Sequence, residues 1–434
     1  MMRRCFISPA WLFALGCLAL AAPALAANDS APIVLTLDVA EQLALERHPA
    51  LGQSEAEIEA SRSRALSTGQ LPDPQLRFGM QNVPIDSLAL NRSEMSMTTV
   101  GVAQMFPPPG KRDLLQQGAE QETVAAQTRH RDLRARIRHD VHMAWLDLFY
   151  QERELGVVRT SFELFDQVVR AALAQYRAGL AQEADVLKAQ LERDELRARE
   201  KTVETARRQA QSRLTRLIGL PAATLAVATE LPPPPAIHTE QELIDTLPSH
   251  PQVATLDAQI RAAELELAAA RRDYYPEFGV EAMYGYRAAR DMGGAKVPDM
   301  LSAGVVMSLP LFPAKRQDAR AQERQARLLA LRHQRDNLLL ELRQQAQTRL
   351  AEHTGIASRL ELVERTLLPQ AEQTVNALLA TYRTGKADMA SVLRARQATL
   401  DYSLRLWRMR TELWMAAAEI NYLGATVVED SHEH

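Results

Sequence analysis

The chain contains the stretch YRTGKADMASVLRARQ at Tyr382–Gln397 and a close copy, YRAGLAQEADVLKAQ, at Tyr176–Gln190. Tyr, Arg, Gly, Val and Leu recur between them at a single offset of 206 residues. In each copy the glycine lies where one helix must reverse into the next, and glycine permits the left-handed backbone of a helix end. Both stretches are therefore predicted to be tips of helical hairpins.

Other pairs of motifs recur at nearly the same offset along the chain. His48-Pro49 and His250-Pro251 lie 202 residues apart, and Gly101 and Gly304 lie 203 apart. The chain therefore reads as two copies of a unit of about 200 residues, joined by the extended, proline-rich segment TELPPPPAIHTEQ. The predicted division is a signal peptide at 1–26, a first structural repeat at 27–230, a second repeat at 231–424 and a C-terminal tail at 425–434.

Each copy predicts the same order of elements. A first helix is followed by two short strands, a very long helix, the tip and a returning helix. The first helices are expected at 37–70 and 240–273, the long helices at 110–176 and 314–382, and the returning helices end near Ile218 and Leu423. A helix of about 67 residues would be roughly 100 Å long, more than a compact domain can hold. Its apolar residues are spaced mostly by three, four and seven, as in a coiled-coil seam, with local bends expected at Gly355 and Pro369.

The predicted strands alternate apolar and polar residues. The pattern is clear at 75–80, 276–287 and 301–309 and weaker at 97–106. Strands of about ten residues with one apolar face suit the wall of an outer-membrane barrel, and a soluble hairpin packed on a core would show the same pattern. Four strands are too few to close a barrel, so membrane strands would require several chains to share one.

The composition excludes several classes of protein. Arg3 and Arg4, an apolar stretch and Ala24–Ala26 form the pattern of an exported signal peptide cut after Ala26, although Cys17 leaves lipidation open. The other cysteine is Cys5, so the mature chain would contain no disulfide. Removing Arg3 and Arg4 changes the net charge from −3 to −5, with 49 basic and 54 acidic residues, which argues against a nucleic-acid partner.

No catalytic or cofactor-binding motif is found, and no segment after the signal peptide has 18 consecutive apolar residues. We therefore expect no enzyme activity, no cofactor and no metal site. His139 with His142, His432 with His434, and Met95 with Met97 are the pairs that could contact a metal, but no familiar spacing of ligands accompanies them.

At this point the chain resembles the TolC family of outer-membrane efflux proteins over about 35–424. The resemblance rests on the duplication, the order of strand pair and long hairpin, and the two Y-R-x-G-x5-[DS]-V-L tips. It implies a mainly α fold with a small β part. Three chains would share a twelve-stranded outer-membrane β-barrel, which continues as a periplasmic α-helical barrel. The location implied is the outer membrane of a Gram-negative cell.

The elements PDPQLRFGMQNVP and QMFPPPGKR are similar to the heavy-metal branch of that family, the CzcC- and CusC-type channels. This implies a passive duct for heavy-metal cations that works with a periplasmic adaptor and an inner-membrane RND pump. Two alternatives remain open. The same architecture could export drugs, organic compounds or a secreted protein, and a non-channel periplasmic coiled-coil adaptor or structural rod is the candidate from another class.

The resemblance also implies roles for residues at the tips. Tyr382 matches a tyrosine that helps to close the entrance, and Asp185 matches its acidic partner. Ser391 and Arg394 stand where the prototype has two aspartates at its narrowest ring, so an anion-favouring or cation-repelling ring is the expectation there. The adaptor-docking residues implied are Arg177, Gly179, Leu180, Arg383, Gly385 and Lys386. The same tyrosine, carboxylate and loop residues could simply cap and solvate helix ends.

Overall fold

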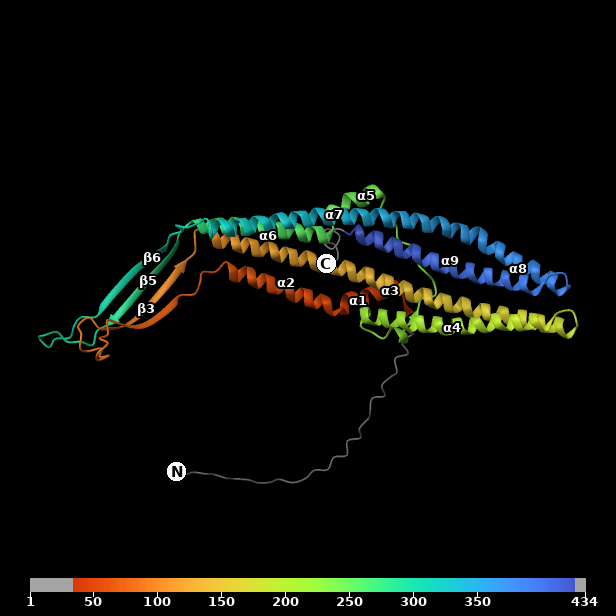
Figure 1. Cartoon of the computed structure of the whole chain (residues 1–434), viewed down its shortest axis with the longest axis horizontal. Helices are drawn as coiled ribbons and strands as arrows, with labels where there is room; N and C mark the ends of the chain where they lie inside the picture. Colours follow the sequence, from red (N-terminus) through yellow and green to blue (C-terminus); the bar gives the residue numbers. More distant parts are fainter. Residues whose placement is uncertain (1–33, 426–434) are drawn as a thin grey trace, which may run out of the picture.

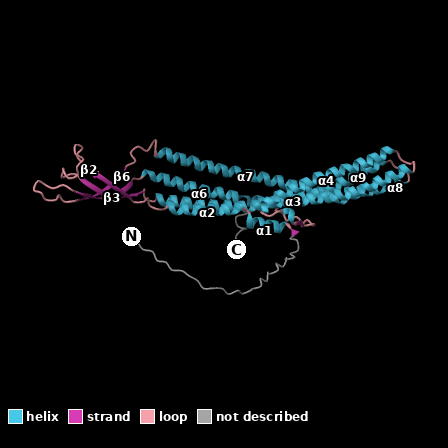
Figure 2. Cartoon of the chain, turned by 90° about the horizontal axis from the view of Figure 1, so that it is seen from below, coloured by secondary structure: helices cyan, strands magenta, loops and turns pink. Residues whose placement is uncertain are grey.

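The computed structural model describes residues 34–425 as one elongated molecule, with a β-sheet at one end and two helical tips at the other (Figure 1). Helices connect the two ends, and the second view shows the same order along the long axis (Figure 2). The helices are α1 (Leu37–Arg47), α2 (Pro49–Thr68), α3 (Lys111–Arg177), α4 (Glu183–Ile218), α5 (Glu240–Thr246), α6 (Pro251–Arg271), α7 (Gln317–Leu362), α8 (Leu368–Arg383) and α9 (Met389–Leu423). The strands are β1 (Val34–Leu35), β2 (Gln75–Gln81), β3 (Met97–Phe106), β4 (Ala226–Val227), β5 (Glu277–Tyr286) and β6 (Met300–Ser308).

Four strands form one antiparallel sheet in the order β2-β3-β5-β6, so the strand pairs of the two repeats lie side by side. The register places residues from all four strands in one row, for example Phe78, Val100, Tyr284 and Leu301. These apolar side chains are exposed, and Leu301 keeps 81% of its surface accessible. One whole apolar face of the sheet is therefore uncovered in the single chain, an arrangement typical of strands that face lipid or another chain.

The opposite face of the sheet is polar and lined by small residues. Arg77 of β2 reaches across β3 to Glu281 of β5, with Nη1 and Oε2 3.0 Å apart. This ion pair spans Gly101 and Ala103 on the intervening strand, where larger side chains would obstruct it. β3, for which the predicted alternation was weakest, alternates buried and exposed residues from Met97 to Ala103.

The helices pack around α3, the longest element. It contacts α2, α4, α6 and α9, and α7 lies along α6 and α9. The largest core is near the middle of the molecule, where Trp145, Leu146 and Phe149 of α3 are fully buried. A second apolar core fills the space between the two hairpins near their tips. The predicted long helices and their returning partners are confirmed, with α3 running for 67 residues.

The first helix of each repeat is shorter than predicted. The expected helix at 37–70 is broken at His48 into α1 and α2, and the one at 240–273 is broken before His250 into α5 and α6. Proline lacks an amide donor and disfavours helical backbone in the residue before it. Pro49 and Pro251 therefore each start a new helix, and the Nδ1 atoms of His48 and His250 cap it by accepting amide hydrogens.

The second long helix contains an irregular turn that the sequence reading placed differently. Helix α7 passes through Gly355 without interruption, and residues Val363–Leu367 form a π-helical turn. Pro369 follows at the start of α8. Its missing amide and its ring are incompatible with a regular i→i−4 turn, so one wider turn absorbs the extra backbone.

Two further observations complete the fold. The short parallel pair β1–β4, which the sequence reading missed, ties the start of the described chain to the residues just before the connector. None of the helices within 34–425 is both long and apolar enough to cross a membrane.

The predicted signal peptide lies outside the described residues, as do Cys5, Cys17, His432 and His434.

Candidate functional site

The two predicted tips lie together at the end of the molecule remote from the sheet (Figure 1). The first tip connects α3 to α4. Gly179 adopts a φ of 76°, and the Leu180 amide donates to the Gln175 carbonyl at 2.9 Å. This closes the last turn of α3 in the way glycine C-caps do.

The second tip repeats this geometry between α8 and α9. Gly385 has a φ of 71°, and the Lys386 amide donates to the Thr381 carbonyl at 3.0 Å. The side-chain amide of Gln175 donates to the Arg383 carbonyl at 3.2 Å, which joins the two tips directly. The repeated sequence thus forms two equivalent turns that are fastened to each other.

Tyr382 has a different environment from its sequence equivalent in the first tip. Tyr382 is 5% exposed and packs in the apolar core between the hairpins, whereas Tyr176 is 44% exposed. Its hydroxyl is buried and has no hydrogen-bond partner among the described residues. Burial, followed by the negative charge of Asp185, raises the pKa of Tyr382. A buried hydroxyl beside a carboxylate can donate a strong hydrogen bond after a small movement.

Asp185 is held at the start of α4. Its carboxylate accepts the amide of Gln182 at 3.4 Å as part of a capping box with that residue. A carboxylate in the first turn of a helix is favoured by the helix dipole. The predicted pair Tyr382–Asp185 is therefore brought close, although the two side chains form no hydrogen bond within the single chain.

Ser391 and Arg394 form a polar cluster on the first two turns of α9. The Arg394 guanidinium donates to the Ser391 hydroxyl at 3.1 Å. A hydrogen bond from Ser391, together with backbone amides and the charge of Arg394, lowers the pKa of Asp388. The positive charge of Arg394 is therefore accompanied by a carboxylate that the sequence reading did not assign to the ring.

The predicted docking residues form the outer surface of the two tips. Arg177, Leu180, Arg383 and Lys386 are all exposed, and Leu180 keeps 70% of its surface accessible. The two tips present an apolar residue with basic neighbours, a combination that suits contact with another protein.

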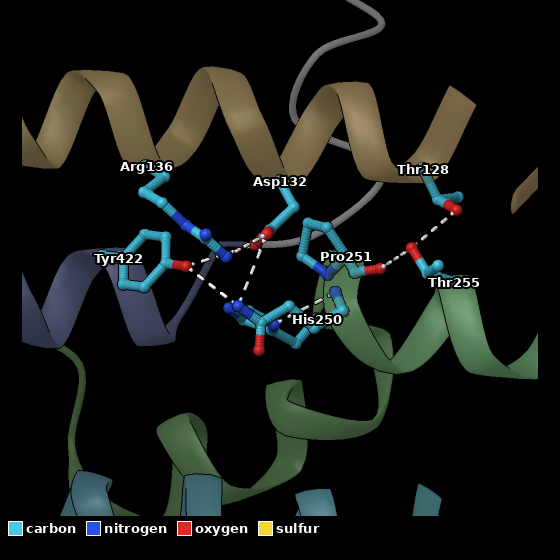
Figure 3. A network of polar contacts seen from close by, with 8 residues as sticks. Thr128, Asp132, Arg136, His250, Pro251, Thr255 and Tyr422 are labelled. Carbon is cyan, nitrogen blue, oxygen red and sulfur yellow. Dashed lines mark hydrogen bonds and ion pairs between the residues drawn. The ribbon is translucent and has the colours of Figure 1, made fainter. Parts of the chain in front are cut away.

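A polar network near the middle of the molecule was missed by the sequence reading (Figure 3). Asp132 of α3 accepts hydrogen bonds from Arg136 at 2.7 Å, from Tyr422 of α9 at 3.2 Å and from Gln252 of α6 at 3.4 Å. The ring of His250 meets that of Tyr422 edge to face at 5.7 Å. The network joins a helix of the first repeat to two helices of the second. The repeated His-Pro motif was the only signal of it in the sequence.

His250 is completely buried in this network. Desolvation lowers its pKa, an effect that the nearby carboxylate of Asp132 opposes and Arg136 reinforces. Its Nε2 atom has no hydrogen-bond partner in the part of the chain that the structure describes. Burial therefore favours the neutral form of the ring, and its Nδ1 atom caps α6 by accepting the amide of Gln252.

No three His, Cys, Asp or Glu side chains within 34–425 are grouped so that they could hold a metal ion. His139 and His142 lie on α3 and have separate partners. His142 contacts Glu41 of α1 at 2.8 Å, whereas His139 contacts Asp140 at 3.3 Å. Met95 is exposed and Met97 lies buried at the start of β3.

Comparison with known proteins gives one family. The model for outer membrane efflux proteins matches residues 40–220 and again 243–423, so each half of the chain matches it separately. The cobalt-zinc-cadmium resistance protein CzcC of Cupriavidus metallidurans is 24% identical over 403 residues, covering 89% of each chain.

Solved structures give the same fold. A membrane protein from Pseudomonas aeruginosa is 19% identical with a TM-score of 0.78, covering 91% of this chain and 93% of that one. The channel CusC is 14% identical with a TM-score of 0.75 and the same coverage. These matches confirm the family resemblance and the fold class that the duplicated tips and strand pairs predicted.

Proposed function

Because the chain belongs to the outer membrane efflux protein family, we propose that it exports heavy-metal cations as the outer-membrane component of a tripartite efflux system. The chain is an outer-membrane efflux protein whose helices extend into the periplasm. Family and fold are those of passive channels. What we propose beyond the family and the fold is the cargo, the assembly and the gate at the tips.

The observation that supports a metal cargo is the likeness to CzcC. It extends over 89% of both chains. The P-D-P, N-x-P and Q-x-F-P-x-P-G-K-R elements around the first strand pair point to the same branch. The candidate cargoes are therefore divalent ions such as cobalt, zinc and cadmium.

The proposed assembly is a homotrimer. Strands β2 and β6 are the edges of the four-stranded sheet and have unpaired backbone groups along one side. Such edges cannot face lipid, because each unsatisfied backbone group in the hydrocarbon region costs several kcal/mol. Pairing β2 of one copy with β6 of the next in a ring of three copies leaves no open edge. The exposed apolar face of the sheet would then face the membrane.

The proposed partners are a periplasmic adaptor, docked on Arg177, Gly179, Leu180, Arg383, Gly385 and Lys386, and an inner-membrane RND pump. These residues form the surface of the two tips, at the opposite end from the sheet. The hydrogen bond from Gln175 to the Arg383 carbonyl holds the two tips together. An adaptor bound to both tips would break this hydrogen bond when it separates them. The energy for transport would come from the pump.

The proposed gate is made by Tyr382, Asp185, Ser391 and Arg394. The Tyr382 hydroxyl is buried and has no hydrogen-bond partner among residues 34–425, and the Asp185 carboxylate is close enough to affect its ionisation. A hydrogen bond between them would hold the second hairpin against the first in the closed state. Arg394 would place positive charge at the entrance, partly offset by Asp388. Metal cations would then pass only after the tips separate.

A channel for drugs or other organic compounds is the second candidate. Solved channels with different names match this chain at nearly equal TM-scores, from 0.70 to 0.78. The fold therefore does not favour one cargo over another.

The test is growth of a deletion strain over graded cobalt, zinc, cadmium, copper and silver, with a panel of drugs in parallel. The proposal predicts sensitivity to a subset of the metals, restored by the intact gene. Sensitivity to drugs alone would overturn the metal cargo and leave the efflux channel in place.

A further inference from the structure

A cavity of about 500 Å³ lies where α3 of the first repeat meets α8 and α9 of the second. Among its lining residues, Phe165 and Leu400 belong to the apolar core near the tips, and Trp407 packs against the central core. Small-molecule sites are typically cavities of about 300–1,000 Å³ with mostly apolar walls and a few polar groups. The cavity has the size and lining of such a site, and none of the proposed gate or docking residues lines it.

Small side chains on both walls leave this space open. Gly156, Thr160 and Ser161 line it from α3, and Thr399 and Ser403 line it from α9. A Cβ placed on Gly156 would meet no heavy atom within 4 Å. The hydroxyls of Thr399 and Ser403 donate to carbonyls of their own helix, so their oxygens can still accept a hydrogen bond. The walls therefore leave room for a molecule that has both apolar and polar parts.

Arg396 of α9 lines the cavity with a charge that the fold does not neutralise. Its Nε atom is buried without a hydrogen-bond partner among residues 34–425, and no carboxylate of that range lies within ion-pair distance. Burial lowers the pKa of the Arg396 guanidinium, because the charged form loses solvation. A guanidinium nevertheless stays charged in proteins, and a partly desolvated charge is stabilised by an anion.

Arg153 of α3 contributes a second guanidinium to the same cavity. It lies over the rings of Phe149 and Trp407, at 5.1 and 5.3 Å from their centroids, and donates to the Thr229 carbonyl. Its Nε atom is also buried and has no hydrogen bond to the described part of the chain. The rings and the carbonyl hold the side chain in place, and neither carries a full charge that would neutralise it.

The acidic side chains that line the cavity do not cancel the two arginines. Glu152 is paired with Arg207 of α4, with Oε1 and Nε 2.7 Å apart. Glu372 of α8 is exposed to solvent, which screens its charge. The cavity therefore has a net positive charge on otherwise mostly apolar walls.

We infer that this cavity binds a small amphipathic carboxylate with an aromatic or aliphatic body. The body would lie against Phe165, Leu400 and Trp407, and the carboxylate would accept hydrogen bonds from Arg396 and Arg153. Guanidinium groups suit this role, because their parallel N–H donors match the two oxygens of a carboxylate. A bound ligand would contact both repeats and hold α8 and α9 against α3. The inference goes beyond the proposed export and does not depend on which cargo crosses the duct.

The experiment measures binding of naphthalene-2-carboxylate to the purified full-length channel by equilibrium dialysis, with detergent micelles alone as the blank. Naphthalene-2-carboxamide has nearly the same shape without the charge and is the comparison probe. The expected result is one saturable site per chain for the carboxylate. The amide should bind at least about tenfold more weakly, because hydrogen bonds between charged groups are the stronger ones.

Two variants test the charge and the space separately. Arg396→Gln should weaken carboxylate binding at least about tenfold and leave amide binding unchanged. Arg405→Gln, at an exposed arginine of α9 outside the cavity, is its matched control. Gly156→Leu should abolish binding of both probes, because the new side chain fills the cavity. Gly52→Leu, at a glycine of α2 that also borders open space, should bind like the unaltered protein.

Three results would overturn the inference. They are the lack of saturable carboxylate binding below about 1 mM, equal binding of the carboxylate and the amide, and equal carboxylate binding by Arg396→Gln and Arg405→Gln. Melting curves without ligand identify any variant whose fold is damaged, and the comparison of the two probes on the unaltered protein stays decisive if a variant fails to fold. Because binding is measured on the purified protein, its failure is separate from any failure of the growth test for export.

Discussion

Tyr382 and Tyr176 occupy the same position in the repeated tip sequence but have different surroundings. Tyr382 is buried between the hairpins beside Asp185, whereas Tyr176 is exposed. The pattern Y-R-x-G predicted the turn in both copies, because glycine at a helix end is a local requirement. It could not predict which tyrosine is buried, since burial depends on how the hairpins pack.

Replacement of Tyr382 by phenylalanine tests the proposed gate. One hydrogen bond contributes about 1 kcal/mol, so losing it should raise the open fraction about fivefold. We expect Tyr382→Phe to increase single-channel conductance events in planar bilayers by about that factor. Tyr176→Phe should have no effect. If Tyr382→Phe leaves conductance unchanged, the hydroxyl is only a buried group at a helix end.

His250 combines two roles at the residue scale. It caps α6 through Nδ1, and it is buried against Asp132, Arg136, Gln252 and Tyr422. The His-Pro motif was visible in the sequence as a repeat, but its capping role was not assigned. The partners of His250 come from three helices and could not be paired without the tertiary structure.

Burial lowers the pKa of His250, so the folded protein should lose stability as pH falls. Below about pH 6.5 the unfolded chain takes up a proton on this residue while the folded chain does not. As the pH falls, the loss of stability therefore begins near the pKa of His250 in the unfolded chain and ends once the pH is below its pKa in the folded chain.

This dependence can be measured as the Tm of the purified protein between pH 7.5 and 5.5. His250→Asn keeps a side chain that can cap a helix and should reduce the fall in Tm over that interval. His48→Asn alters the equivalent cap in the first repeat and should not reduce it. If the Tm of His250→Asn fell with pH as much as that of the unaltered protein, the buried His250 would not be the cause of the pH dependence.

At the scale of elements, two glycines, Gly385 and Gly355, lie in different backbone conformations. Gly385 has a positive φ at a tip, and Gly355 lies inside α7. A Cβ would meet open space at both positions, so only the backbone distinguishes them.

Alanine at these two positions should therefore have opposite effects on stability. Gly385→Ala should destabilise the protein by about 1 kcal/mol, because an L-residue disfavours left-handed backbone. Gly355→Ala should stabilise it by about 0.5–1 kcal/mol, because glycine is a poor helix former. Melting curves of the two variants provide the measurement. Equal shifts of the same sign would contradict the predicted tip geometry.

The elements themselves could be predicted well where the signal was local and periodic. Gly110 and the tip motif at Tyr176 predicted α3 within one residue of each end, and alternation predicted the strands of the sheet, least clearly for β3. The breaks at Pro49 and Pro251 were missed because good helix formers surround them. The π-helical turn at Val363–Leu367 was missed because it precedes the proline that causes it.

At the scale of the molecule, the internal duplication gave the order of elements in both halves. It also led to the family, which the separate match of each half confirms. The polar network around Asp132 was not predictable in the same way. It joins residues that are more than 100 positions apart, as with Asp132 and Gln252.

The proposed trimer predicts contact between β2 of one copy and β6 of the next. Both native cysteines precede Ala26, so engineered cysteines would be the only ones in a processed chain. We expect Gln75→Cys to form a disulfide with one of Ser302→Cys, Val306→Cys or Ser308→Cys, because paired strands place Cβ atoms about 5 Å apart. Non-reducing gels should show a ladder that stops at three chains. Single-cysteine variants are the control, and a ladder that runs further would rule out a closed ring of three.

The most direct test of the central claim is the metal content of cells. Cells lacking the gene, cells with the gene restored and cells producing Tyr382→Phe would be loaded with cobalt, zinc or cadmium, then transferred to metal-free medium. Elemental analysis would follow the metal that remains over time. The account predicts that cells without the gene retain several-fold more of at least one metal and that the restored gene reverses this. Equal retention of all three metals with and without the gene would contradict it.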